Sequence, residues 1–71
     1  MVAITKDSLI AATIAKYMTL RHVDLDALAI AARMSDRTFH RKRKNPSSFT
    51  VNELRQVYDR LSVPKEERVG L

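Results

Sequence analysis

Positive charge is concentrated in one short stretch of this 71-residue chain. Between Arg33 and Lys44 there are six basic residues and one acid, so this stretch carries the whole formal net charge of +5. Lysine and arginine clusters bind the phosphates of nucleic acids, and arginine also matches the two acceptors on the major-groove edge of guanine. The stretch therefore predicts an anionic partner, with nucleic acid as the first choice. Its charged residues are Arg33, Asp36, Arg37, Arg41, Lys42, Arg43 and Lys44.

The rest of the chain is electrically neutral, with seven basic and seven acidic side chains. A solvated helix face without a partner is the alternative interpretation of the basic stretch. Surfaces built only for solubility usually mix both signs, which favours the binding interpretation.

No residue pattern for catalysis or metal binding is present. The chain has no cysteine, its two histidines have no partner at a metal-ligand spacing, and it lacks a glycine-rich phosphate loop. Asp24 and Asp26 are explained as acids that complement a helix dipole. We therefore expect no enzyme activity, no metal and no cofactor. We also expect no signal peptide and no membrane contact, because no apolar run is long enough.

Length and composition predict a single all-α domain over residues 1–71. One glycine and two prolines are too few for a strand-rich fold, and no sustained alternation of apolar and polar residues occurs. We expect a compact bundle of four or five helices. The first three cover about residues 5–20, 25–33 and 36–44. The fourth begins after the cap at Thr50 and runs to about residue 62, and a last helical turn covers about 65–69. The helix starts are predicted by the N-cap residues Thr5, Asp24, Ser35 and Thr50.

The apolar residues predict which helix faces are buried. Thr50 and Glu53 match a capping box, and Phe49 and Leu54 occupy the positions of a hydrophobic staple. Val51 is expected on the buried face of the fourth helix, and Leu9 beside the buried face of the first.

The third helix has one large apolar residue, Phe39, so it depends on the helices beneath it. If Phe39 faces the core, the exposed face carries the candidate base contacts Asp36, Arg37, His40 and Arg41. Capping is the slightly favoured role for Asp36, and plain solvent exposure is an equal alternative for His40. The candidate phosphate contacts are Ser35, Lys42, Arg43, Lys44 and Ser47, although capping and loop turns are the commoner duties of such serines.

Residues 25–44 resemble the helix-turn-helix of the Cro and repressor-like group of phage and bacterial regulators. The matching residues are Leu28-Ala29, Met34-Ser35 and Thr38-Phe39, and the segment 45–54 looks like the loop and fourth helix of phage-encoded members. The resemblance covers about residues 9–67. It implies a lambda-repressor-like domain whose third helix enters the major groove of an operator, as a sequence-specific regulator of transcription. It also implies a location in the bacterial host cytoplasm, on the nucleoid.

Three positions depart from the family pattern. Leu25 stands where the family often has glutamine, and Lys42 and Arg43 stand near a position that is usually apolar. Arg33 occupies the turn position that favours glycine, where a left-handed backbone would cost on the order of 1 kcal/mol.

Useful specificity from so small a domain predicts a homodimer on a two-fold-related site. The candidate dimer contacts are Val63, Val69 and Leu71, which could equally cap the core of the monomer. From another functional class, a protein-interaction module or inhibitor built on the same scaffold is the main alternative. An RNA binder is a weaker one, since a helix enters the narrow major groove of duplex RNA poorly.

Overall fold

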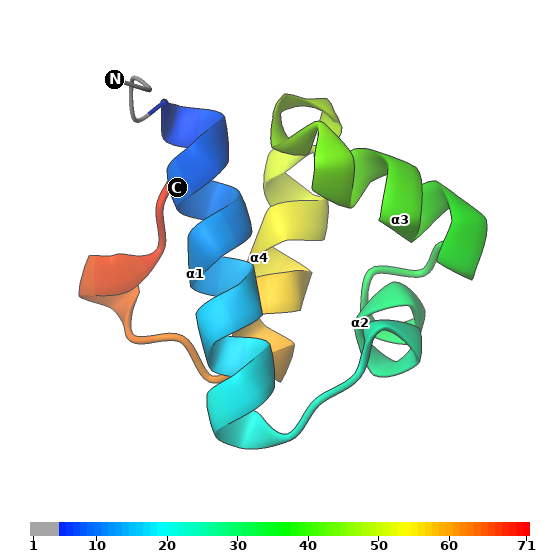
Figure 1. Ribbon diagram of the computed structural model, residues 1–71, viewed down its shortest axis with the longest axis horizontal. Coiled ribbons are helices and arrows are strands. Elements are labelled where there is room, and N and C mark those ends of the chain that lie inside the picture. The colour runs from blue at the N-terminus through cyan, green and yellow to red at the C-terminus, as the bar shows by residue number, and fades with distance from the viewer. Residues whose placement is uncertain (1–4) are drawn as a thin grey trace.

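The computed structural model describes residues 5–71, and all regular structure in this range is helical (Figure 1). The predicted all-α class is thereby confirmed. The α-helices are α1 (Lys6–Arg21), α2 (Leu25–Ala31), α3 (Asp36–Lys44) and α4 (Val51–Arg60). Two single 3₁₀ turns follow α3 and α4, namely η1 (Pro46–Ser48) and η2 (Lys65–Glu67).

The helices begin where the capping residues predict. Each cap side chain accepts a hydrogen bond from the backbone N–H three residues later, which satisfies a donor that has no partner within the helix. The predicted capping box is also present, because the Glu53 side chain accepts in turn from the backbone of Thr50. The four bonds join Thr5 to Ser8, Asp24 to Ala27, Ser35 to Thr38 and Thr50 to Glu53.

The end of α3 at Lys44 matches the prediction, and the other helix ends differ from it by one or two residues. α2 stops at Ala31 instead of residue 33, α4 stops at Arg60 instead of residue 62, and the last turn covers only 65–67. After α1, α2 and α4 the backbone enters the left-handed region, at His22, Arg33 and Ser62, with φ of 55°, 58° and 53°. The next N–H in each case donates to the carbonyl five residues back, which closes a Schellman turn. The left-handed backbone considered for Arg33 is therefore present.

Fourteen buried apolar side chains from all four helices and their connections form one core. The rings of Phe39 and Phe49 meet within it, with their centroids 5.7 Å apart. One expectation about its edge is wrong, because Val51 is 57% exposed, and Leu9, expected beside the buried face of the first helix, is 44% exposed. Val51 is the first residue of α4, on the rim of a pocket, and Leu9 is turned 100° around α1 from Ile10.

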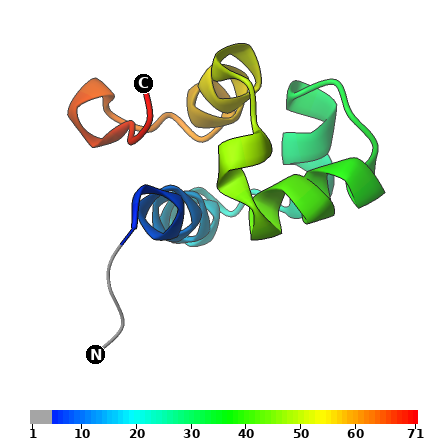
Figure 2. The ribbon, with the colours of Figure 1, turned by 90° about the horizontal axis from the view of Figure 1, so that it is seen from above.

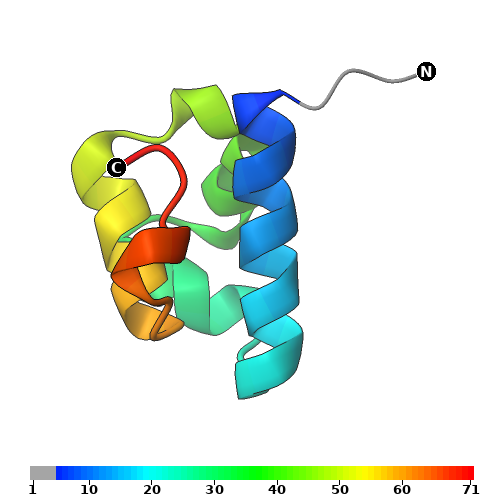
Figure 3. The ribbon, with the colours of Figure 1, turned by 90° about the vertical axis from the view of Figure 1, so that its left-hand side faces the viewer.

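The helices place α3 at one side of the molecule and the C-terminal segment at the other (Figure 2). α2 packs against both α3 and α4, and η1 packs against α1 and α3. The C-terminal segment covers α1 and α4 away from α3 (Figure 3). The scaffold therefore presents α3 at an edge and keeps the chain end away from it.

Polar contacts hold the C-terminal segment in place. Glu67 accepts hydrogen bonds from Tyr17 Oη at 2.6 Å and from Lys16 Nζ at 3.1 Å, and Tyr58 Oη donates to the Val69 carbonyl at 2.8 Å. Val63 is buried and Val69 packs against the core. Both residues therefore cover the core of the monomer, which is the alternative to a dimer contact. Leu71 is 49% exposed.

Candidate nucleic-acid interface

The orientation of α3 is determined by Phe39, which is 1% exposed. With Phe39 in the core, the opposite side of the helix faces solvent, and Ser35 fixes where the helix begins. Ser35 Oγ accepts from Thr38 N at 3.2 Å and donates to Thr38 Oγ1 at 2.9 Å. The side chains that the helical period places on the outer face are all exposed, namely Asp36, Arg37, His40, Arg41 and Lys44.

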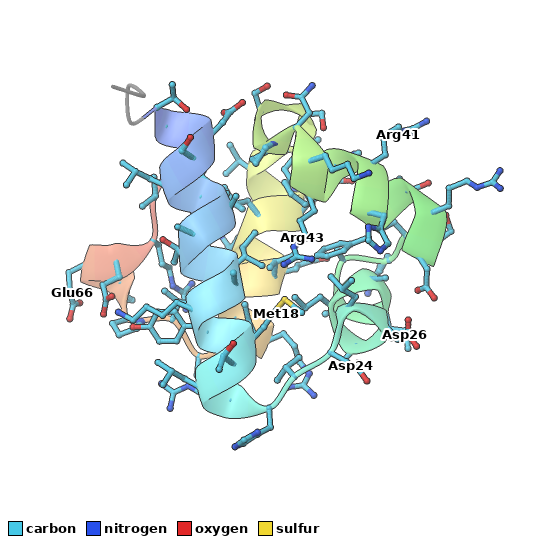
Figure 4. The ribbon with its side chains drawn as sticks, in the orientation of Figure 1. Met18, Asp24, Asp26, Arg41, Arg43 and Glu66 are labelled. Atoms are coloured by element: carbon cyan, nitrogen blue, oxygen red, sulfur yellow. The ribbon has the colours of Figure 1, made fainter. Side chains whose placement is uncertain are left out.

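Most cations of the basic stretch have no carboxylate partner among residues 5–71. Three ion pairs form in this part of the chain, and two of them, Lys16–Glu67 and Arg68–Asp59, lie outside the stretch. In Figure 4 the Arg41 side chain projects away from the body, whereas Arg43 lies on the side of α3 toward α1. Arg43 is accordingly only partly exposed. The outer face of α3 thus carries uncompensated positive charge.

Lys42 is placed differently from the other cations of α3. Its Nζ lies 2.8 Å from Glu53 Oε1, and the two side chains are only 19% and 24% exposed. The same carboxylate oxygen accepts from Thr50 N at 2.9 Å. Both hydrogen bonds lower the pKa of Glu53, and the one from Lys42 has the larger effect. Lys42 therefore faces α4, and its ammonium group already has a carboxylate partner. This position does not suit the phosphate contact expected from the sequence.

Two carboxylates meet at the N-terminal end of α3, a feature that the sequence interpretation missed. A side-chain hydrogen bond with Asp36, and then the charge of Asp36, raise the pKa of Asp26 on α2. Asp24 adds a smaller repulsion. Figure 4 shows Asp24, the N-cap of α2, and Asp26, on its first turn, below α3. Ten residues separate Asp26 from Asp36, so only the packing of α2 on α3 brings them together.

Both candidate serines have local hydrogen-bond partners. Ser35 caps α3, and Ser47 Oγ donates to Asn45 Oδ1 at 3.0 Å within the loop. Ser47 also lines a pocket of about 240 Å³, together with Lys6 at the start of α1. Ser35 therefore acts as a helix cap and Ser47 stabilises the loop, which are the alternative roles given for them in the sequence analysis. Ser47 lies beyond the C-terminal end of α3.

Within residues 5–71, no three His, Asp or Glu side chains gather closely enough to hold a metal ion. No helix in the same range has the length and apolar character needed to cross a membrane. The chain matched no protein-family model, no curated protein and no solved structure.

Proposed function

We propose that the protein is a sequence-specific regulator of transcription that binds double-stranded DNA with α3 in the major groove. The observation that carries this proposal is the outer face of α3, where Arg37, Arg41 and Lys44 are exposed and make no ion pair with residues 5–71. An unpaired cationic face on an otherwise neutral body attracts a polyanion. The Cro and repressor-like resemblance of residues 25–44 supports the same orientation.

The dimensions of α3 are compatible with this role. A helix with its side chains is about 10–12 Å across, and the major groove of B-DNA is about 12 Å wide. In the proposed complex, Arg37 and Arg41 lie one helical turn apart on the outer face and donate to guanine edges. Lys44 and Arg43, near the end of the helix, bind phosphates. Asp36 and His40 occupy the same face as further base contacts.

The proposed complex contains two copies of the protein on a two-fold-related operator. A single α3 reaches only a few base pairs, and one such domain gives modest discrimination between sites. Homodimerisation doubles the number of bases that are read.

Selection from a pool of random duplexes, followed by affinity measurements, tests the proposal. On the selected site, Arg37→Ala and Arg41→Ala should each weaken binding by about 1–3 kcal/mol. The same variants should lose much less on a scrambled duplex, where only charge is lost. Arg55→Ala is the matched control, because Arg55 is an exposed arginine on α4, outside the proposed face.

Two results would contradict the proposal. A salt dependence near zero would remove the DNA interpretation and favour an acidic protein partner. Failure of the selection to give any preferred site would leave a nonspecific binder and not a regulator.

A further inference from the structure

The turn between α2 and α3 contains an arginine in a backbone conformation that favours glycine. Arg33 has a φ of 58°, in the left-handed region. His22 and Ser62 adopt the same conformation in the turns after α1 and α4. In all three turns the following N–H closes the bond to a carbonyl five residues back. The fold therefore requires this backbone geometry three times, but it does not require an arginine.

The surroundings of Arg33 distinguish it from the other two left-handed residues. Its side chain is exposed and makes no ion pair with any residue in the range 5–71. It lies two residues before the N-cap Ser35 and four before Arg37, at the N-terminal end of the cationic face. The connection that holds it is at the edge of the molecule, between α2 and α3 (Figure 1).

Two acids lie at the end of α3 that is next to Arg33. Asp26 and Asp36 lie together here, and they would repel a nearby phosphate. Arg33 and Arg37 are the cations next to Asp36 in the chain. With α3 in the major groove, a residue just before the helix would lie at the margin of that groove, where the sugar-phosphate backbone runs. Its planar guanidinium offers two parallel donors to phosphate oxygens.

We propose that Arg33 binds a backbone phosphate of the DNA beside the N-terminal end of α3. This inference rests on the proposed DNA-binding function. Together with Lys44 at the other end, Arg33 would restrain α3 at both ends and so fix its register on the bases. The strained backbone is then retained because the turn must supply a cation at this point.

The test uses glycine variants of two turns with the same geometry. Arg33→Gly and Ser62→Gly should both raise the melting temperature, by about 4 °C, because glycine adopts a left-handed backbone without strain. Only Arg33→Gly should weaken binding to the selected duplex, about five- to tenfold at 0.1 M salt, through loss of a charge-assisted contact. It should also reduce the slope of log affinity against log salt by about 0.9, the value of one phosphate contact. Arg33→Lys should keep the wild-type slope.

The outcomes separate this inference from the proposed function. Wild-type protein that binds duplex DNA with a steep salt dependence, beside an Arg33→Gly variant with unchanged affinity and slope, would overturn the role of Arg33 alone. Arg33 would then only complement the C-terminal dipole of α2. Wild-type protein without salt-dependent duplex binding would overturn both. A stabilised Arg33→Gly variant with weakened binding, beside a stabilised Ser62→Gly variant with wild-type binding, is the expected result.

Discussion

Lys42 and Glu53 join the end of α3 to the start of α4 through one oxygen atom. Glu53 Oε1 lies 2.8 Å from Lys42 Nζ and 2.9 Å from the backbone nitrogen of Thr50. The contact that completes the cap of α4 therefore also holds the C-terminal half of α3. A lysine at this place stabilises the helix without an apolar side chain.

Lys42→Ala is expected to lower the free energy of unfolding by about 1–2 kcal/mol, because it leaves a partly buried carboxylate without its cation. The salt dependence of DNA binding should stay unchanged. Lys44→Ala, at an exposed position, should leave the free energy of unfolding unchanged. It should reduce the slope of log affinity against log salt by about one unit. Urea unfolding and salt titrations of both variants check this. An unchanged stability with a reduced slope for Lys42→Ala would show that Lys42 leaves Glu53 to contact phosphate.

Acid should destabilise the protein partly through Glu53. Its pKa in the folded state is lowered from the ordinary value of 4.5, so its stabilising contribution is complete above pH 4.5 and is lost as the pH falls through the folded value. Melting temperatures measured from pH 7 to pH 3 should therefore fall less steeply for Glu53→Gln than for the wild type. Glu66→Gln is the control, since Glu66 is exposed and forms no ion pair with the described residues (Figure 4). Equal acid profiles for Glu53→Gln and the wild type would contradict this role.

Asp26 should have the opposite effect on the acid profile. The neighbouring Asp36 raises its pKa above the ordinary value of 3.8, so the folded state binds a proton more readily than the unfolded state there. Its contribution grows as the pH falls and is lost as the pH rises through the folded value. Asp26→Asn should therefore steepen the loss of stability as the pH falls into the acid range. Thermal melts at several pH values measure this, with Asp7→Asn as a control on another helix, and a shallower profile for Asp26→Asn would refute it.

The burial of Phe39 predicts that α3 depends on one side chain. Phe39→Ala should cost about 3–5 kcal/mol, which is much of the stability of so small a domain. Thr50→Ala, which removes the cap of α4, should cost about 1 kcal/mol. Thermal or urea unfolding of the two variants compares them directly. A near-wild-type melt for Phe39→Ala would mean that another face of α3 is buried and that Arg37 and Arg41 do not share the outer face.

Local signals in the sequence predicted the helix starts and the burial of Phe39. An N-cap such as Ser35 bonds to a backbone group three residues away, so its effect can be deduced from neighbouring residues alone. The helical period likewise placed Arg37 and Arg41 opposite Phe39.

Features that depend on packing between helices could not be predicted in this way. The pairing of Lys42 with Glu53 and the approach of Asp26 to Asp36 join residues that are ten or more positions apart. The left-handed backbones of His22 and Ser62 had no glycine to indicate them. In retrospect, the apolar Val23 and Val63 that follow them were a usable signal, because such a residue often completes a Schellman turn.

The position of Gly70 close to α1 and α4 has a practical consequence for attaching probes to the protein. Gly70 has a φ of 89°, and a Cβ atom there would lie 3.2 Å from both Ile10 Cδ1 and Leu54 Cδ2. The C-terminal segment therefore lies close against α1 and α4, on the side of the molecule away from α3 (Figure 2). A dye coupled after Leu71 would therefore report the tumbling of the whole domain in fluorescence anisotropy, and a surface tether at that point would leave the outer face of α3 open to duplexes.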